Sequence, residues 1–180
     1  MTFEEHAKKL ESLARSAFSM KNEVENAANM IKECLLGGHK VLACGNGGSA
    51  SDANHFIAEL VCKYKQDRKP LEGISLNANP AVMTAIANDY SYDKVFERQV
   101  EALGKTGDVL IAISTSGTSE NVVKAAQKAK EIGIKTIALT GNVGTLAEEC
   151  DFSVKVQNKE VPRIQEMHAF ILHEICEVLE

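Results

Sequence analysis

The sequence Val109-Leu110-Ile111-Ala112-Ile113-Ser114-Thr115-Ser116-Gly117-Thr118-Ser119 passes from a wholly apolar run into a stretch of hydroxyl side chains around one glycine. The residues that follow, as far as about Gly133, have a helical pattern, so the stretch predicts a buried strand, a turn and a helix. A helix directs its first backbone N–H groups and the positive end of its dipole into the preceding turn, where phosphate is stabilised. An ordinary N-cap turn needs about one or two hydroxyls. This turn offers more, and the sequence therefore predicts a phosphate site.

Short apolar runs alternate with helical patterns on both sides of this stretch. The other strands are expected at residues 40–44, 73–76, 135–139 and 152–156. The other helices are expected at residues 49–63, 80–87, 93–103 and 144–149, and from Pro162 to the end of the sequence. Alternating units with apolar strands imply a parallel sheet that is covered on both faces. We therefore expect an α/β fold, a three-layer αβα sandwich with a five-stranded parallel sheet.

A helical segment precedes this core. Residues 1–36 have the spacing of two helices or of one broken helix, which Gly37-Gly38 then ends. The apolar face of this segment would cover the core or pair with another subunit, and its length favours pairing. No linker or low-complexity tract interrupts the chain, so residues 1–180 are interpreted as a single domain, with residues 37–180 as the α/β core.

The composition argues against several classes of protein. A net charge of −5 and an aromatic content of 5% are unfavourable for binding nucleic acid or anionic membranes. No apolar run approaches the roughly 20 residues of a membrane span, and the first residues have no signal-peptide core. The five cysteines are odd in number and lack close pairs, which favours reduced thiols. We expect a cytoplasmic protein that binds neither nucleic acid nor membrane.

A second candidate loop, Gly45-Asn46-Gly47-Gly48-Ser49, follows the first expected strand. Ligands of parallel sheets bind beyond the carboxyl ends of the strands, near a switch in strand order, so this loop and residues 114–119 are expected to line one crevice. The loop fits the glycine pattern of dinucleotide sites, but no acid ends the next strand to hold a ribose. Its glycines would instead let backbone amides approach a polar ligand such as a sugar. Ser49 or Ser51 is expected to cap the helix that follows.

Two helices carry pairs of nitrogen and oxygen donors. His55 and Glu59 are four residues apart on one helix face, and Gln165 and His173 lie about two turns apart on the final helix. Such pairs are often surface hydrogen bonds. Alternatively, the four donors could meet around one ion, and the imidazoles suit zinc. Asn88-Asp89 would either end a helix or offer an amide and a carboxylate to sugar hydroxyls.

Five motifs occur in order along the chain: Cys44-Gly45-Asn46-Gly47-Gly48-Ser49, Asp52-Ala53-x-His55-Phe56-x-x-Glu59-Leu60, Ala87-Asn88-Asp89, Ile113-Ser114-Thr115-Ser116-Gly117-x-Ser119 and Arg163-Ile164-Gln165-Glu166-x-His168. Together they resemble the phosphoheptose isomerases, also called sedoheptulose 7-phosphate isomerases, of the sugar isomerase (SIS) domain family. The resemblance covers nearly the whole chain and implies a flavodoxin-like sheet.

The resemblance also implies a homotetramer with active sites between subunits, and an aldose–ketose isomerase that acts on a phosphorylated heptose. The product would lead to activated heptose for bacterial lipopolysaccharide or capsule. One zinc per subunit would be held by His55, Glu59, Gln165 and His173. Substrate contacts would come from Asn46, Gly47, Gly48, Ser49, Glu59, Asn88, Asp89, Ser114, Thr115, Ser116, Ser119 and Gln165. An enediol mechanism needs a base for the carbon-bound proton and an acid for the oxygens, roles that we assign to Glu59 and His173.

Two alternatives from other classes stay open. A bacterial regulator that binds the replication initiator resembles the chain at residues 84–89 and 163–168. It differs at the positions of Glu59 and His173, and the presence of both residues here favours the enzyme. The second alternative is another SIS enzyme, such as an arabinose-phosphate isomerase or an amino-sugar etherase. The chain departs from residues common in the phosphoheptose isomerases at Lys63, Thr118 and Pro162.

Overall fold

The computed structural model describes residues 2–180 and contains a five-stranded, wholly parallel sheet. The strand order is β2-β1-β3-β4-β5, which is the order of flavodoxin-like folds. The strands are β1 (Val41–Gly45), β2 (Gly73–Ser75), β3 (Val109–Ser114), β4 (Lys135–Thr140) and β5 (Phe152–Lys155). The predicted α/β fold and its five strands are therefore confirmed, because each strand lies within one residue of its expected limits.

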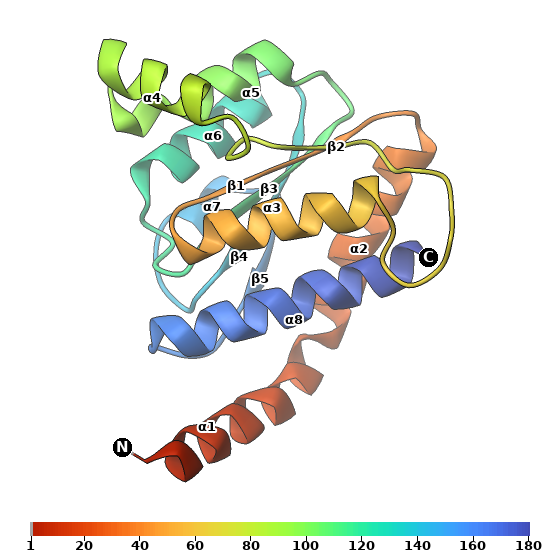
Figure 1. The fold of residues 1–180 in the computed structure, drawn as a ribbon, viewed down its shortest axis with the longest axis vertical. Helices are drawn as coiled ribbons and strands as arrows, with labels where there is room; N and C mark the ends of the chain where they lie inside the picture. Colours follow the sequence, from red (N-terminus) through yellow and green to blue (C-terminus); the bar gives the residue numbers. More distant parts are fainter. Residues whose placement is uncertain (1) are drawn as a thin grey trace.

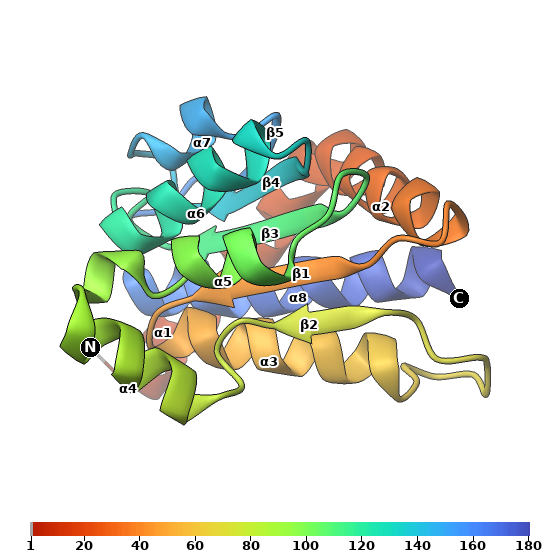
Figure 2. The same ribbon diagram turned by 90° about the horizontal axis from the view of Figure 1, so that it is seen from above.

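Helices cover both faces of the sheet, as Figures 1 and 2 show. The helices over one face are α2 (Lys21–Leu36), α3 (Gly48–Val61) and α8 (Val161–Leu179). Those over the other face are α5 (Glu97–Leu103), α6 (Glu120–Glu131) and α7 (Leu146–Glu149). Because side chains alternate along a strand, Ile111 of β3 enters the first apolar core and its neighbour Leu110 enters the second.

The order of the strands reverses between β1 and β3, which pair along their length with Val41 opposite Val109 and Gly45 opposite Ile113. Every residue of both strands is buried. The chain leaves β1 for α3 on one face and leaves β3 for α6 on the other, so the two connections diverge and leave a crevice at this edge. In Figure 2 the arrowheads point towards this end of the molecule, where α4 (Pro80–Asp89) also lies.

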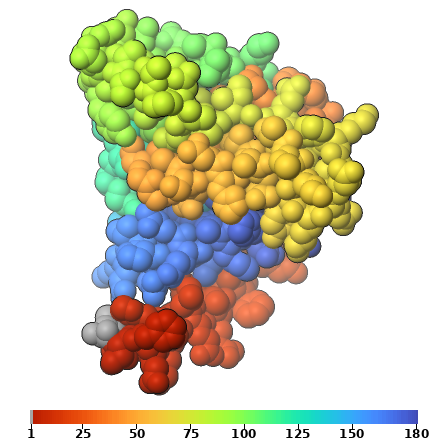
Figure 3. Space-filling model, viewed as in Figure 1, coloured from red at the N-terminus to blue at the C-terminus, as the bar shows by residue number. Residues whose placement is uncertain are grey.

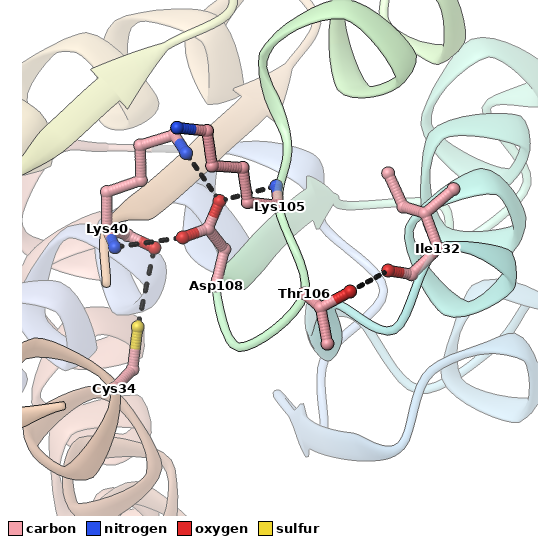
Figure 4. Close-up of polar contacts among 6 residues, drawn as sticks. All are labelled: Cys34, Lys40, Lys105, Thr106, Asp108 and Ile132. Atoms are coloured by element: carbon pink, nitrogen blue, oxygen red, sulfur yellow. Dashed lines mark hydrogen bonds and ion pairs between the residues drawn. The ribbon is translucent and has the colours of Figure 1, made fainter. Parts of the chain in front are cut away.

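Asp108 joins the N-terminal ends of β1 and β3, opposite the ends that carry the two loops (Figure 4). Its buried carboxylate accepts hydrogen bonds from the backbone N–H groups of Lys40 at 3.0 Å and Lys105 at 2.8 Å, and from Lys40 Nζ at 2.6 Å. Burial raises the pKa of Asp108, but these donors together hold the pKa below its ordinary value. The ion pair therefore stays charged and fixes the starts of the two strands whose far ends carry the candidate loops.

The N-terminal segment is a broken helix, as expected. It consists of α1 (Phe3–Ser16), the 3₁₀ turn η1 (Ala17–Met20) and α2. A capping box between Thr2 and Glu5 begins α1. Figures 1 and 3 show α1 projecting from the core. Phe18 is 82% exposed, and with Phe170 of α8 it lines an apolar groove of about 300 Å³.

The start of α3 differs from the expectation. Neither Ser49 nor Ser51 caps this helix: the N-cap residue is Gly47, which has a φ of +55° and no side chain to cap with. Ser49 is instead buried inside the first turn. The reason is close packing, because a Cβ added to Gly45 would lie 2.7 Å from the Cβ of Ser49. The glycines let the chain turn directly from strand to helix.

The segment between β2 and β3 also differs in detail. Asn79 caps α4 by accepting hydrogen bonds from two backbone N–H groups, as expected, but Asn88 and Asp89 form the end of α4 rather than a turn after it. The helix expected at residues 93–103 is divided into η2 (Tyr92–Lys94) and α5, because the fully buried Val95 and Phe96 turn into the core between them. Within residues 2–180 no helix is long and apolar enough to cross a membrane.

Candidate active site

The hydroxyl loop, residues 114–119, connects the end of β3 to the start of α6. The Oγ of Ser114 is buried beneath the loop and lies 3.0 Å from the Oγ of Ser119. The Oγ of Ser116 accepts hydrogen bonds from the backbone N–H and the hydroxyl of Thr118, at 3.2 and 3.0 Å. Ser119 is the N-cap residue of α6 but makes no side-chain capping hydrogen bond. Its hydroxyl is not used by the cap, which favours a ligand site over an ordinary N-cap.

A glycine holds this loop against the end of β4. Gly117 has a φ of +64°, and its N–H donates to Ser114 Oγ at 3.2 Å. A Cβ at Gly117 would lie 2.3 Å from the carbonyl oxygen of Val143. The carbonyl of Thr115 accepts a hydrogen bond from Gly141 at 3.2 Å. The backbone of the loop is therefore fixed in place. The N–H groups of the first turn of α6, which follows the loop, are of the kind that can bind an anion.

Asn46 of the glycine loop is tied to the first turn of α6. Its Nδ2 donates to Oδ1 of Asn121 at 2.8 Å, and Nδ2 of Asn121 donates back to Oδ1 of Asn46 at 2.9 Å. The hydroxyl of Tyr92 donates to the same Asn46 oxygen at 3.0 Å. The structure therefore brings the two predicted loops together at one edge of the sheet, as the sequence indicated. It also engages most of the Asn46 side chain in holding them together.

Gln165 lies at the same end of the molecule. A Cβ at Gly48 would be 2.3 Å from Nε2 of Gln165, so the amide of Gln165 packs directly against the backbone of the first turn of α3. Gln165 is thus next to the predicted glycine loop, and it belongs to the crevice rather than to the middle of α8.

His55, Glu59 and His173 form a second cluster, further along α3 and α8. Figures 1 and 3 show these two helices side by side. Nε2 of His55 lies 2.9 Å from Oε1 of Glu59. The ring of His173 is 5.1 Å from that of His55, edge to face. The predicted base and acid therefore lie in one cluster, and the Glu59 side chain is only 21% exposed.

Of the four predicted zinc ligands, His55 lies with Glu59 and His173, while Gln165 lies against the first turn of α3. Gln165 and His173 are eight residues apart, which is roughly 12 Å along a helix, and Gln165 lies at the Gly48 end of α3. Within residues 2–180 no group of three or more His, Cys, Asp or Glu side chains is arranged to hold a metal ion. Two imidazoles and a carboxylate still have the chemistry that zinc prefers.

The side chains of Asn88 and Asp89 lie exposed at the end of α4. Nδ2 of Asn88 donates to Oδ1 of Asp89 at 2.8 Å, so in the described chain they pair with each other rather than with either loop. They lie only a few residues before Tyr92, whose hydroxyl reaches Asn46. Their predicted contact with substrate stays a prediction.

Some residues of the site escaped prediction from sequence. Asn121 is buried although it is polar. The sequence feature that could have indicated its role is its position, two residues after the N-cap residue Ser119. Asp52 lies one turn before His55, and one of its carboxylate oxygens is buried without a hydrogen-bond partner among the described residues. Burial raises the pKa of Asp52 to about 6, against the opposing charge of His55.

The ring of Tyr64 stacks on that of His173, with the ring centroids 5.5 Å apart. Nothing in the sequence around Tyr64 indicates this contact.

The chain is similar to known proteins over most of its length. A model of the SIS domain family matches residues 4–141. A phosphoheptose isomerase of Aliarcobacter butzleri is 48% identical over 171 residues, covering 94% of this chain and 90% of that protein. One of Clostridium acetobutylicum is 50% identical, covering 88% and 81%.

Two solved structures are also similar. The phosphoheptose isomerase of Neisseria gonorrhoeae has a TM-score of 0.88 at 38% identity and covers 98% of this chain and 97% of its own. That of Francisella tularensis has a TM-score of 0.91 at 35% identity, covering 99% and 98%.

The strand order is that of flavodoxin-like α/β proteins, whose ligands bind beyond the strand ends at the switch in strand order, where the hydroxyl loop lies. The chain belongs to the SIS domain family and, within it, to the phosphoheptose isomerases. It is an isomerase.

Proposed function

We propose that the chain converts sedoheptulose 7-phosphate to D-glycero-D-manno-heptose 7-phosphate, the first step towards activated heptose for a bacterial lipopolysaccharide or capsule. The observation that carries the proposal is the joint presence of a hydroxyl loop at a helix N-terminus and a Glu59–His173 cluster on the neighbouring helices. Relatives that are named phosphoheptose isomerases and match most of the chain support it.

The hydroxyl loop would bind the terminal phosphate. Thr115, Ser116 and Ser119 present hydroxyls, and the first N–H groups of α6 contribute further donors. Ser114 is buried beneath them and braces Ser119. Binding the unreactive end of the sugar fixes the position of its C1 and C2 atoms relative to α3 and α8, which is how an enzyme converts binding into orientation.

Glu59 and His173 would carry out the proton transfers. The Glu59 carboxylate removes a proton from C1 of the ketose and returns it to C2, through an enediol. His173 moves the proton that must pass between the oxygens on C1 and C2. His55 lies 2.9 Å from Glu59 and limits the orientations that this carboxylate can adopt. No atom is gained or lost, so the reaction needs no oxidant or reductant.

We propose in addition that His55, Glu59 and His173, with Gln165, bind zinc. The donor chemistry of these residues fits the metal. When bound, zinc would act as a Lewis acid towards the sugar carbonyl.

We also propose that the chain works as a homotetramer with active sites between subunits. The apolar groove lined by Phe18 and Phe170, together with the projecting α1, offers apolar surface that a second copy would bury.

The test is incubation of the purified protein with sedoheptulose 7-phosphate. The aldose product, which has the same mass as the ketose, is then detected by chromatography and NMR. Formation of D-glycero-D-manno-heptose 7-phosphate supports the proposal. Turnover of arabinose 5-phosphate alone, or no turnover together with specific retention of a replication initiator, would instead establish one of the alternative functions.

A further inference from the structure

The loop that follows α3 contacts the imidazole of His173. Tyr64, three residues beyond the end of α3, places its ring on that of His173, with centroids 5.5 Å apart and planes inclined by 28°. His55 contacts His173 from another direction, edge to face, at 5.1 Å. The imidazole is therefore restrained by stacking on one side and by an edge contact on another. Both arrangements are favourable geometries for pairs of aromatic rings.

A carboxylate at the end of α8 holds the backbone around Tyr64. Oε1 of Glu180 accepts hydrogen bonds from the N–H groups of Tyr64, Lys65 and Gln66, at 3.1, 2.7 and 3.0 Å. Three consecutive amides directed at one charged oxygen fix the path of a loop that has no regular secondary structure here. Glu180 is exposed, so this contact does not serve the core.

Two further residues, Lys65 and Arg68, tie the same loop to both helices. Nζ of Lys65 lies 2.5 Å from Glu177 of α8 and 5.1 Å from the centroid of the Tyr64 ring. The guanidinium of Arg68 donates to the backbone carbonyls of Glu59 at 2.9 Å and Leu60 at 3.0 Å. The loop therefore connects the helix end that carries Glu59 to the helix that carries His173.

We propose that Tyr64 is a positioning residue for the isomerisation, which orients the His173 imidazole through ring stacking, and that Glu180 holds Tyr64 in place. The inference rests on the proposed function, in which His173 transfers protons between the sugar oxygens. Stacking uses the faces of the rings, so a phenylalanine at position 64 should serve nearly as well as the tyrosine. An aliphatic side chain should not.

The experiment compares Tyr64→Leu, Tyr64→Phe and Glu180→Ala in the full chain, with sedoheptulose 7-phosphate as substrate. Misplacing a catalytic group by about 1 Å can cost on the order of a hundredfold, and we expect Tyr64→Leu to lower kcat by about tenfold or more. We expect KM and the inhibition constant of inorganic phosphate to change less than about twofold, because the hydroxyl loop is untouched. Tyr64→Phe should restore turnover, and Glu180→Ala should lower kcat in the same direction as Tyr64→Leu.

Glu148→Ala is the control, since it changes an exposed side chain on α7, away from α3 and α8. Parental kcat in Tyr64→Leu would overturn the proposal. A loss in Tyr64→Phe as large as in Tyr64→Leu would also overturn it, because the hydroxyl rather than the ring face would then be responsible.

A second readout does not depend on turnover. The imidazole C–H signal of His173, assigned by its loss in His173→Ala, is compared by ¹H–¹³C NMR in the same variants. Loss of the neighbouring ring should shift this signal in Tyr64→Leu and leave it close to its original position in Tyr64→Phe. If the parent protein does not turn over sedoheptulose 7-phosphate, the proposed function fails while this contact is still measured. An unshifted signal in Tyr64→Leu would overturn the positioning role itself.

Discussion

The carboxamides of Asn46 and Asn121 form two reciprocal hydrogen bonds, of 2.8 and 2.9 Å, across the crevice between the glycine loop and the hydroxyl loop. Each amide donates to the oxygen of the other, and Tyr92 adds a third hydrogen bond to Asn46. The pair sets the separation of the two loops, because the residues belong to the connections on opposite faces of the sheet.

This pair gives the first prediction. Asn121→Asp replaces the donating nitrogen with an oxygen that faces the Asn46 oxygen, and Asn121 is buried. Leaving such a group unpaired costs about 1–3 kcal/mol, so we expect KM for the phosphosugar to rise by roughly tenfold. Steady-state kinetics on the variant measure this effect. Asn22→Asp, an exposed change of the same chemistry, is the control, and an unchanged KM in Asn121→Asp would show that the loops do not need the pair.

Gly117 gives the second prediction. Gly117→Ala would force a positive φ on a residue with a Cβ and would place that Cβ 2.3 Å from the Val143 carbonyl. Gly38→Ala is the matched control, because Gly38 has a φ of +76° but nothing within 4 Å of an added Cβ. The strain of about 1–2 kcal/mol should appear in the unfolding of both variants. Weaker inhibition by inorganic phosphate should appear only in Gly117→Ala, and equal phosphate affinity in both variants would contradict the assigned role of the loop.

His168 gives a prediction about pH. Its ring is fully buried, and neither nitrogen has a hydrogen-bond partner among the described residues. Burial lowers the pKa of His168 from 6.5 to about 4, although the backbone of Thr140 opposes the shift. The unfolded chain therefore binds this proton more readily than the folded chain. The contribution to stability is complete above pH 6.5 and is lost as the pH falls towards 4, by up to about 3 kcal/mol.

Urea unfolding at pH 7.5 and at pH 5 measures this loss. We expect His168→Leu to reduce the difference in unfolding free energy between the two pH values, because leucine has no proton to bind. His6→Leu, at an exposed position, should leave the difference unchanged. An undiminished pH dependence in His168→Leu would exclude burial of this imidazole as its cause.

Zinc is tested on protein purified without added metal. We expect about one zinc per subunit by elemental analysis, and loss of metal in His55→Ala, because imidazole is the ligand that suits zinc here. His39→Ala is the control. Absence of metal together with full activity in the presence of a chelator would remove zinc from the proposal.

The strands and both loops were predictable from the sequence for a physical reason. Residues 41–45 and 109–114 are buried on both faces of a parallel sheet, and strands in that position are nearly continuous apolar runs. Since the carboxyl ends of adjacent parallel strands share one edge, the position of the two loops followed from the strands alone.

The details inside the crevice were not predictable, because they depend on packing between distant segments. Asn46 and Asn121 are 75 residues apart, and no local pattern pairs them. The prediction that Ser49 or Ser51 caps α3 was wrong, because close packing of Gly45 on Ser49 places the helix start at Gly47. The spacing of Gln165 and His173 was visible in the sequence. That Gln165 meets the first turn of α3, away from His55, depends on how the two helices run side by side.

The central claim is that Glu59 and His173 move protons on a seven-carbon sugar phosphate. The most direct measurement follows conversion of sedoheptulose 7-phosphate by the parent protein, Glu59→Gln and His173→Ala, with Glu148→Gln as an exposed control. Each catalytic variant should lower kcat by roughly a hundredfold or more, while its oligomeric state by size-exclusion chromatography stays that of the parent. Isomerisation at nearly the parental rate in either variant would contradict the assignment.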